Sequence, residues 1–270
     1  MTVKKILLLS LGIVITSMTW AQTNPSSKRK DKKSEKKERI NALIKMEEEG
    51  ELIFNKHNIF GFKLNSDGWG MSFEKGKFIT PRKTRIIQIE FNEKKHPKEE
   101  KDAGSFDFFT GNVNQYIFGK ANNFYQLKGS YGQQYLIGGK SNKNGVSVSA
   151  LWAGGVALGI EKPYYVDAQD RTTNEGVRVK FADIEEKLNQ YTYLGASGFT
   201  VGWGEMQLNP GAHLKTALRF DYGRFNEVVS AIEAGVNVEY YSGKVQQMIK
   251  NKERNLFFNA YVSLLFGKRK

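Results

Sequence analysis

The stretch Val146-Ser-Val-Ser-Ala-Leu-Trp-Ala-Gly-Gly-Val-Ala-Leu-Gly-Ile160 carries the strongest structural signal in the chain. Successive side chains of a β-strand point to opposite faces, so its even positions share one face. That face is apolar throughout and includes Trp152, whereas the odd face consists mainly of Ser, Ala and Gly. A tilted membrane-spanning strand needs roughly 9–11 residues, while a soluble strand has about 5–6. We therefore expect lipid on one side of this strand and a packed barrel lumen on the other.

Seven further segments alternate in the same way: residues 59–73, 84–92, 124–137, 199–204, 214–222, 228–240 and 256–266. In the first of them the parity changes at Ser66-Asp67-Gly68, which leaves either a bulge in one long strand or a two-residue hairpin. With a bulge there, the chain has eight strands. An even number of alternating strands with aromatic ends is typical of a transmembrane barrel. We predict an all-β fold, an eight-stranded antiparallel transmembrane β-barrel over residues 58–270.

The second face of these strands carries charges of both signs. Its charged residues are Glu90, Lys128, Lys215, Arg219, Asp221, Glu233 and Glu239. An eight-stranded lumen is only wide enough for side chains, so these residues could pair there as a satisfied polar network. The small face of residues 146–160 leaves room for the long side chains of segments 214–222 and 228–240. A soluble all-β protein would instead turn its polar face to water; we favour the membrane barrel.

The N-terminal part resembles an export signal followed by a charged arm. Residues 1–21 combine Lys4-Lys5, an apolar run and small residues before a break after Ala21, which predicts a cleaved signal peptide. The apolar run is shorter than the ~20 residues of a helical anchor, and the absence of cysteine excludes a lipoprotein and any disulfide. Residues 22–57 are predicted to be a periplasmic arm, with a short amphipathic helix from about Ser34 to Gly50.

Much of the net charge of +13 lies in this arm, because Lys28–Arg39 contains eight basic and three acidic residues. Such a block is usually a solvated tail, although it could also tether the chain to a membrane surface. In an exported protein, the nearby polyanions are lipid phosphates and acidic polysaccharide. We therefore expect outer-membrane lipids or lipopolysaccharide as partners, and no nucleic acid.

The last strand, Asn255-Leu-Phe-Phe-Asn-Ala-Tyr-Val-Ser-Leu-Leu-Phe-Gly267, resembles the C-terminal signal strand of outer-membrane barrels, although Lys268-Arg-Lys270 follows it. Residues 59–266 are similar to a small barrel of the OmpA/OmpX kind. Three short pieces, Lys95–Glu99, Phe118–Lys120 and Glu161–Tyr165, resemble uncharacterised Bacteroidota outer-membrane barrel proteins. The resemblance implies a location in the outer membrane of a Gram-negative cell, without a known activity.

No catalytic or metal-binding pattern stands out. The three histidines, His57, His96 and His213, have no metal-ligand spacing. Barrel lipid hydrolases use His with Ser or Asp, but His213 and Asp221 lie eight residues apart on one strand, too far to touch. The glycines of Gly68-Trp-Gly70 and Gly202-Trp-Gly204 precede no helix and so form no phosphate loop. We predict no catalytic residue, no metal site and no cofactor.

The longest connections between the predicted strands, residues 93–123 and 164–197, are candidate contact surfaces. With eight strands and both termini in the periplasm, both connections would face the periplasm, the reverse of the usual pattern. This favours a non-catalytic scaffold or accessory subunit of an envelope complex for assembly, secretion or anchoring. Its partner contacts are expected at Lys162-Pro163-Tyr164-Tyr165. The alternatives are a surface adhesion or ligand-binding barrel and a barrel lipid hydrolase; a hairpin at residues 66–68 would allow the long connections to be extracellular.

Overall fold

The computed structural model describes residue 38 and residues 54–107, 112–140, 145–223 and 227–270. The chain divides into two units, Met1–Glu51 and Leu52–Lys270, and nearly all described residues belong to the second. The predicted signal peptide and almost all of the basic arm lie outside the described residues, so these boundaries stay predictions. Within the described residues, no helix has the length and apolarity needed to cross a membrane.

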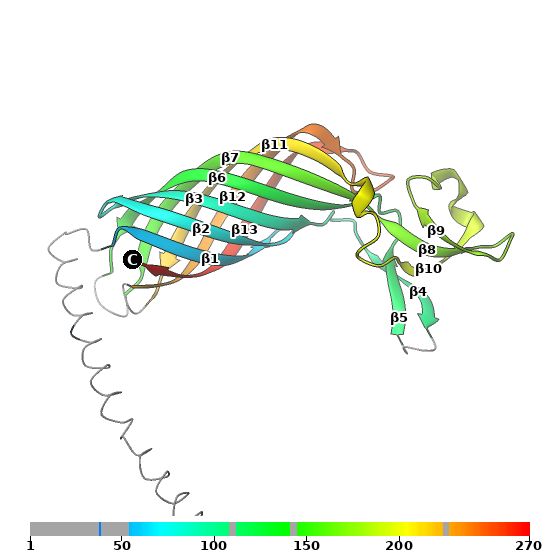
Figure 1. The fold of residues 1–270 in the computed structure, drawn as a ribbon, viewed down its shortest axis with the longest axis horizontal. Helices are drawn as coiled ribbons and strands as arrows, with labels where there is room; N and C mark the ends of the chain where they lie inside the picture. The colour runs from blue at the N-terminus through cyan, green and yellow to red at the C-terminus, as the bar shows by residue number, and fades with distance from the viewer. Residues whose placement is uncertain (1–37, 39–53, 108–111, 141–144, 224–226) are drawn as a thin grey trace, which may run out of the picture. The chain divides into compact units, whose positions relative to one another are not determined.

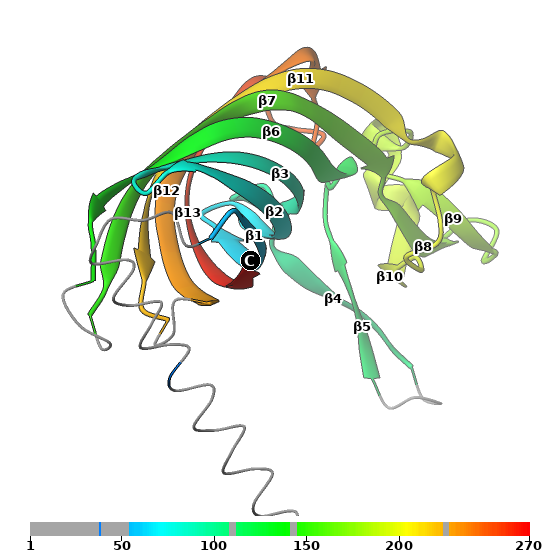
Figure 2. The ribbon, with the colours of Figure 1, turned by 60° about the vertical axis from the view of Figure 1, so that its left-hand side comes forward.

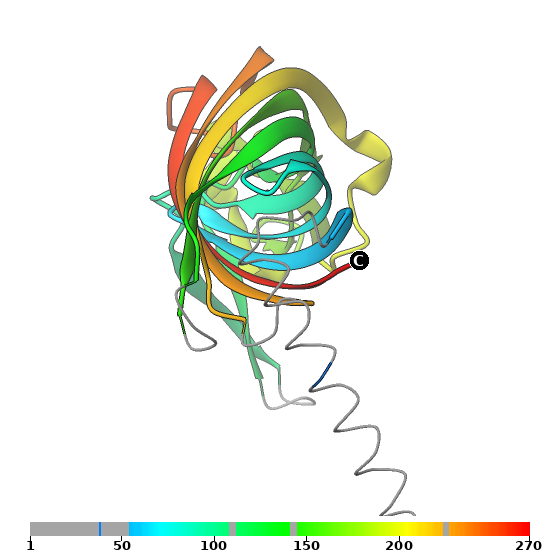
Figure 3. The ribbon, with the colours of Figure 1, turned by 90° about the vertical axis from the view of Figure 1, so that its left-hand side faces the viewer.

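Eight antiparallel strands form a barrel (Figure 1). They are β1 (Lys56–Asn65), β2 (Gly68–Thr80), β3 (Lys83–Lys94), β6 (Asn122–Gly138), β7 (Ser147–Pro163), β11 (Gln207–Asp221), β12 (Val228–Val245) and β13 (Arg254–Arg269). They pair in the order β1-β13-β12-β11-β7-β6-β3-β2, and the ring closes because β1 pairs with both β13 and β2. Figure 3 shows these strands curving around a common axis. The predicted eight-stranded antiparallel sheet is confirmed.

The segment 59–73 is a hairpin, which is one of the two alternatives that its sequence leaves open. Asn65 pairs with Gly68, and Ser66-Asp67 forms the turn between β1 and β2. Gly68 has a positive φ of 154°, and a Cβ there would lie 1.9 Å from the carbonyl oxygen of Glu93 on β3. Only glycine allows β3 to approach this closely. The parity change in the sequence is therefore the turn of the hairpin.

The predicted strand 199–204 does not form. These residues lie in a turn and in the 3₁₀ helix η2 (Trp203–Glu205), and the next barrel strand is β11. Gly202 has a φ of +88°, a left-handed conformation that ends an extended chain. Residues Asn209-Pro-Gly211, which precede the predicted strand 214–222, are also part of β11 and pair with residues 157–159 of β7. Relative to the predicted set, the hairpin at residues 66–68 adds one strand and the absence of a strand at residues 199–204 removes one. The barrel therefore still has eight strands.

The strand register assigns every connection to one of two ends of the barrel. At the loop end, Asn65 pairs with Gly68, Lys94 with Phe124, and Gln207 with Glu161. This end therefore carries the turn 66–67 and the connections 95–121, 164–206 and 246–253. At the terminal end, His57 pairs with Arg269 and Thr80 with Lys83. Both ends of the barrel segment lie at the terminal end, so the prediction that the long connections share an end with the termini was wrong.

The connections at the loop end fold into two small sheets, which we call the loop module (Figure 2). The first is a hairpin of β4 (Lys101–Asp107) and β5 (Asn112–Ile117). The second has the order β10-β8-β9, with β8 (Tyr165–Asp170), β9 (Gly176–Lys180) and β10 (Tyr191–Ala196), and includes the 3₁₀ helix η1 (Glu185–Gln190). Three connections contribute to the apolar core of the loop module. This core consists of Ala121, Tyr164, Val166, Phe181, Ile184 and Ile249.

Candidate functional site

Inward-facing side chains fill the barrel in layers. An apolar cluster of Ile59, Val229, Ala231 and Leu265 lies at the terminal end. The loop end holds an aromatic layer, in which Phe124 stacks on Phe257 at 5.5 Å and meets Tyr241 edge-on at 5.5 Å. A Cβ at Gly159 would lie 2.9 Å from Phe124 and 3.0 Å from Tyr241, so this glycine makes room for rings. Charged side chains occupy the space between the two layers.

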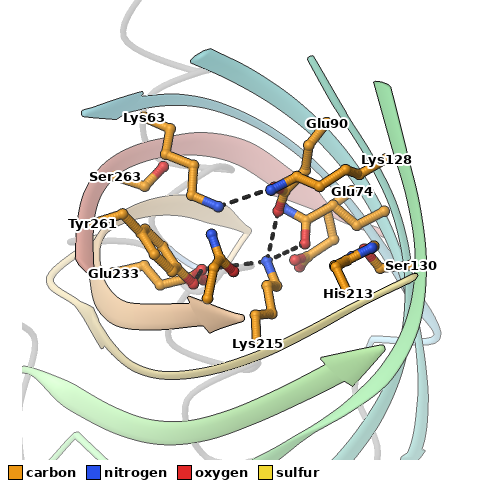
Figure 4. A network of polar contacts seen from close by, with 12 residues as sticks. Lys63, Glu74, Glu90, Lys128, Ser130, His213, Lys215, Glu233, Tyr261 and Ser263 are labelled. Atoms are coloured by element: carbon orange, nitrogen blue, oxygen red, sulfur yellow. Dashed lines mark hydrogen bonds and ion pairs between the residues drawn. The ribbon is translucent and has the colours of Figure 1, made fainter. Parts of the chain in front are cut away.

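Glu90 on β3 lies at the centre of the charged layer. Its carboxylate accepts hydrogen bonds at 2.9 Å from Lys63 on β1 and at 2.9 Å from Lys215 on β11. The ammonium of Lys128 on β6 lies 3.3 Å away. Glu90 is fully buried, and its three cationic partners are 1–4% exposed. Figure 4 shows these side chains converging from different strands.

Arg219 on β11 organises a second cluster. Its guanidinium binds Glu74 on β2 at 2.7 Å and Glu233 on β12 at 2.6 Å. Glu233 also accepts a hydrogen bond from the hydroxyl of Tyr261 at 2.7 Å and lies 3.6 Å from Lys215. Lys215 therefore joins the Arg219 cluster to the Glu90 cluster.

Glu239 on β12 extends the network toward the loop end. Its carboxylate binds Lys128 at 2.8 Å and Lys94 at 2.8 Å. Lys94 in turn binds Asp67 in the β1–β2 turn at 2.6 Å. The connected network holds five cations and five carboxylates, namely Lys63, Lys94, Lys128, Lys215 and Arg219 with Asp67, Glu74, Glu90, Glu233 and Glu239. Its formal charges balance, which is what a network removed from water requires.

Of the seven charged residues predicted for the lumen, the structure brings six together and separates one. Asp221 lies at the terminal end, where it binds Arg269 and accepts a hydrogen bond from the backbone amide of Gly223 at 2.8 Å. Sequence reasoning missed four members of the network, namely Lys63, Asp67, Glu74 and Lys94. The signal was present for Lys63, which lies between the outward residues Phe62 and Leu64 on β1. It was weaker for Glu74, which lies between Phe73 and the outward cation Lys75 on β2.

The lumen also contains a serine–histidine pair. The Oγ of Ser130 on β6 lies 2.8 Å from Nε2 of His213 on β11. The two residues are 4% and 2% exposed, and Nδ1 of His213 has no hydrogen-bond partner among the described residues. A hydrolytic triad needs a third group on that nitrogen and access for a substrate. This arrangement provides neither.

The predicted partner contact at residues 162–165 is largely internal. Lys162 is 3% exposed, donates a hydrogen bond to the backbone oxygen of Phe199 at 2.6 Å, and lies 5.3 Å from the ring centre of Trp203. The hydroxyl of Tyr164 accepts a hydrogen bond from the amide of Ile117 at 3.0 Å. These side chains hold the loop module to the barrel. Only Pro163 and Tyr165 remain half-exposed.

Tyr165 belongs to a polar cluster that fastens η2. Its hydroxyl donates to Glu205 at 2.5 Å, and Lys180 on β9 binds the other oxygen of Glu205 at 2.6 Å. The hydrogen bond from Lys180 lowers the pKa of Glu205, and the same bond raises the pKa of Lys180. We infer that the pair stays ionised over the neutral range and keeps η2 attached to β9.

Aromatic rings form a cluster on the loop module. Phe181 lies 5.1 Å from Tyr193 and 5.2 Å from Phe118, and Tyr116 lies 5.4 Å from Tyr193. Burial raises the pKa of Tyr193 to about 12, so its hydroxyl stays protonated. Phe118 is 40% exposed, which leaves one ring of the cluster open to a ligand.

The outer surface of the barrel carries many exposed apolar side chains. Its exposed large side chains include Phe62, Leu64, Ile87, Trp152, Val156, Leu214, Phe258 and Val262. Tyr125 lies at the loop-end rim of this surface and is stacked between Phe91 and Trp203, at 6.0 Å from each. Aromatic residues at a rim are typical of the boundary between lipid tails and headgroups.

Within the described residues, no group of His, Asp and Glu could hold a metal ion. No protein-family model matches the sequence, and no curated protein matches it either. Solved structures to which the chain is similar include the attachment invasion locus protein Ail of Yersinia pestis in complex with the heparin analogue sucrose octasulfate. That comparison has 9% identity and a TM-score of 0.38, and covers 81% of this chain and 100% of that one.

The Neisserial surface protein A is 11% identical, with a TM-score of 0.39 over 80% of this chain and 97% of that one. The N-terminal β-barrel domain of Pseudomonas aeruginosa OprF is 14% identical, with a TM-score of 0.33 over 79% and 98% of the two chains. The expected likeness to OmpA/OmpX-like barrels holds for the antiparallel sheet of eight strands. The similarity to the Bacteroidota group stays a prediction.

Proposed function

We propose that this chain is a non-catalytic outer-membrane barrel whose loop module is a recognition surface on the outside of the cell. The single observation that carries the proposal is the strand register, which sets both long connections at the end opposite the termini. Binding through these loops, as in the adhesion or ligand-binding alternative, is then favoured over a periplasmic scaffold.

The distribution of polarity supports a lipid environment. Val156, Leu64 and Phe258 are 70–71% exposed on the outer surface, whereas Glu90 and Glu239 are fully buried in the lumen. In water this arrangement would expose a continuous apolar surface and bury charges, the reverse of a soluble fold. In a bilayer the same arrangement is favourable, because lipid tails cover the apolar surface and the lumen pairs its own charges.

The lengths of the connections support the orientation. At the terminal end the connections are the short segments 81–82, 139–146 and 222–227, whereas at the loop end they include residues 95–121 and 164–206. Outer-membrane barrels have short periplasmic turns and longer extracellular loops. The termini would then lie in the periplasm, together with the basic arm.

The loop module is suited to recognition because it is folded rather than a set of isolated loops. Its apolar core holds Phe181 and Ile249 from different connections, and an isolated bridge pairs Lys120 with Met248. A rigid scaffold with exposed loop residues is the usual basis of binding surfaces. The aromatic cluster around Phe118 is the part of the module that we expect to contact a ligand.

Single-cysteine labelling of intact cells tests the orientation, because the chain has no cysteine of its own. Thr173→Cys introduces a thiol at an exposed position of the loop module, and Pro81→Cys introduces one at an exposed turn of the terminal end. We expect an impermeant maleimide added to intact cells to label residue 173 and not residue 81. Trypsin added to intact cells should cleave the protein at the exposed Arg171 or Arg178. Labelling of residue 81 alone would reverse the orientation and restore the periplasmic scaffold.

A second candidate remains a scaffold or accessory subunit of an envelope complex. The observation in its favour is β9, which pairs only with β8 among the described strands and leaves one edge of the small sheet open. Open edges accept a strand from another protein. Replacing Val179 with proline removes a backbone donor from this strand; loss of a co-purifying protein in mild detergent, with the barrel still folded, would favour the complex.

A further inference from the structure

Basic side chains cover part of the outer surface at the terminal end, and we call this set the basic rim patch. It consists of Lys56 on β1, Lys75 and Lys77 on β2, Lys83 and Arg85 on β3, and Lys268 on β13. Strand alternation directs all six outward, since their strand neighbours at positions such as His57, Glu74 and Thr84 are buried. The patch spans four strands that are adjacent in the barrel, in the order β13-β1-β2-β3.

The register brings these like charges together. Lys77 is paired directly with Lys56 on one side and with Arg85 on the other. Asn58 is paired with both Lys75 and Lys268. Directly opposed residues of an antiparallel pair have Cβ atoms about 4.5–5.5 Å apart, and like charges at that separation destabilise the sheet. A negative group that binds between them would remove this cost.

The described part of the protein does not supply that group. None of the six cations forms an ion pair with a described residue. The carboxylates nearest in the strands face the lumen, where Glu74 binds Arg219 and Asp221 binds Arg269. The acidic residue in the described part of the β11–β12 connection is Glu227, which is half-exposed and directly precedes β12. Its backbone oxygen accepts a hydrogen bond from the amide of Arg269, so it lies beside β13, at the Lys268 edge of the patch.

On the same strands, the next outward positions toward the loop end carry apolar side chains. Phe60, Phe73 and Ile87 are 39%, 42% and 58% exposed, two residues from Asn58, Lys75 and Arg85 respectively. Two residues along a strand correspond to about 6.6 Å. A molecule that fits both the row of cations and the row of apolar side chains has a negative head and long apolar tails. A soluble polyanion would satisfy the cations and leave the apolar row uncovered.

The remaining strands do not repeat this pattern. On β6 and β12 the outward residues at the terminal end include Tyr135, Ile137 and Val228. Val146 directly precedes β7 and Tyr222 directly follows β11; all five are exposed and carry no charge. The apolar surface therefore reaches the rim on one side of the barrel, whereas on the other it stops at the cations. This asymmetry marks a localised site.

We propose that the basic rim patch binds the phosphates of anionic phospholipids in the leaflet that faces the terminal end. The proposal rests on the proposed function, since it requires the apolar surface to be in a bilayer. Lys75, Lys77 and Arg85 are its central residues, because Lys77 is paired directly with Arg85, and Lys75 and Arg85 border the apolar row. Each cation near an anionic lipid surface contributes on the order of fivefold in affinity.

Native mass spectrometry of the full-length folded chain in mild detergent, titrated with phosphatidylglycerol or phosphatidylcholine, tests the site. We expect tighter binding of phosphatidylglycerol, and loss of the preference in the variant Lys75→Gln/Lys77→Gln/Arg85→Gln. The control Lys244→Gln/Lys252→Gln/Arg254→Gln removes the same charge from exposed positions at the loop end and should retain the preference. Inorganic phosphate at constant ionic strength should not displace the lipid.

Three outcomes would overturn the proposal: equal binding of the two lipids by the unmodified chain, equal losses in the two triple variants, or displacement by inorganic phosphate. A separate assay of insertion into phosphatidylcholine vesicles distinguishes this failure from that of the proposed function. If the chain inserts and shows no lipid preference, only the proposed lipid site is contradicted. If the chain does not insert, the proposed membrane barrel is contradicted as well.

Discussion

Arg219 and Glu74 bind each other across the full width of the barrel. Two parallel contacts join them, from Nη1 to Oε1 at 2.8 Å and from Nη2 to Oε2 at 2.7 Å. Their strands, β11 and β2, have three strands between them in either direction around the ring. A bidentate pair of this kind fixes both distance and orientation, so it acts as a strut between opposite walls.

Replacing Glu74 with glutamine should destabilise the barrel by about 3–5 kcal/mol, because it leaves a buried guanidinium without one of its two carboxylates. Urea titration of the protein folded into vesicles measures this change. The matched control is Arg178→Gln, which breaks a half-exposed pair with Asp167 of similar length, 2.9 Å, and should cost about 0–1 kcal/mol. Equal effects of the two substitutions would mean that the strut contributes little.

The alternation of the strands was sufficient to predict most of the lumen. Glu90, Lys128 and Arg219 stand out in sequence because each is a charge flanked by outward apolar or aromatic residues on a long strand. Their partners could not be assigned, since Glu74 and Arg219 are 145 residues apart and no local pattern relates opposite walls of a barrel. Alternation specifies the face of each side chain, and ring closure determines which of them meet.

The sequence left the choice between bulge and hairpin at residues 66–68 open, and it wrongly predicted a strand at residues 199–204. Residues 199–204 alternate as a strand would, but Trp203 stacks on Tyr125 and the left-handed Gly202 turns the chain. Residues 66–68 fit a bulge as well as a hairpin, and the antiparallel pairing of β1 with β2 identifies the hairpin. The hairpin adds one strand and the loss of the predicted strand 199–204 removes one, so the count stays at eight. The long connections nevertheless lie at the opposite end from the one expected with a bulge. Sidedness therefore depended on contacts between distant segments.

The contact between Lys180 and Glu205 should make the attachment of η2 depend on pH. The pKa of Glu205 is lowered in the folded protein, so its contribution is complete above about pH 4.5 and is lost as the pH falls through the lowered value. The pKa of Lys180 is raised, so its contribution is lost only above about 10.5. Fluorescence of Trp203, with the other tryptophans replaced by phenylalanine, should therefore change on acidification below pH 4.5.

Glu205→Gln is the matched variant for that titration, because it keeps the shape of the side chain and removes its charge. We expect the acid transition of Trp203 to disappear in this variant. The same change in Glu205→Gln and in the parent chain would assign the transition to another group.

His213 and Ser130 are expected to have no hydrolytic role. Both are buried in the lumen, where they form a hydrogen bond with each other. Lipid A and phospholipids from cells that express the chain and from cells that express His213→Ala should have identical mass spectra. Deacylated lipid that appears with the unmodified chain and disappears with His213→Ala would restore the barrel lipid hydrolase and contradict the assignment as non-catalytic.

Val156→Arg separates a membrane barrel from a soluble one. Val156 lies near the middle of β7 and is 71% exposed on the outer surface. On a protein surface in water, such a substitution usually changes stability by less than about 0.5 kcal/mol. On the lipid-facing side of a barrel, arginine at the bilayer midplane costs about 2–4 kcal/mol. Thr173→Arg adds the same charge to the exposed loop module and should be neutral in either case. A large loss of stability confined to Val156→Arg would mean that this surface contacts lipid tails, whereas two neutral substitutions would contradict the bilayer.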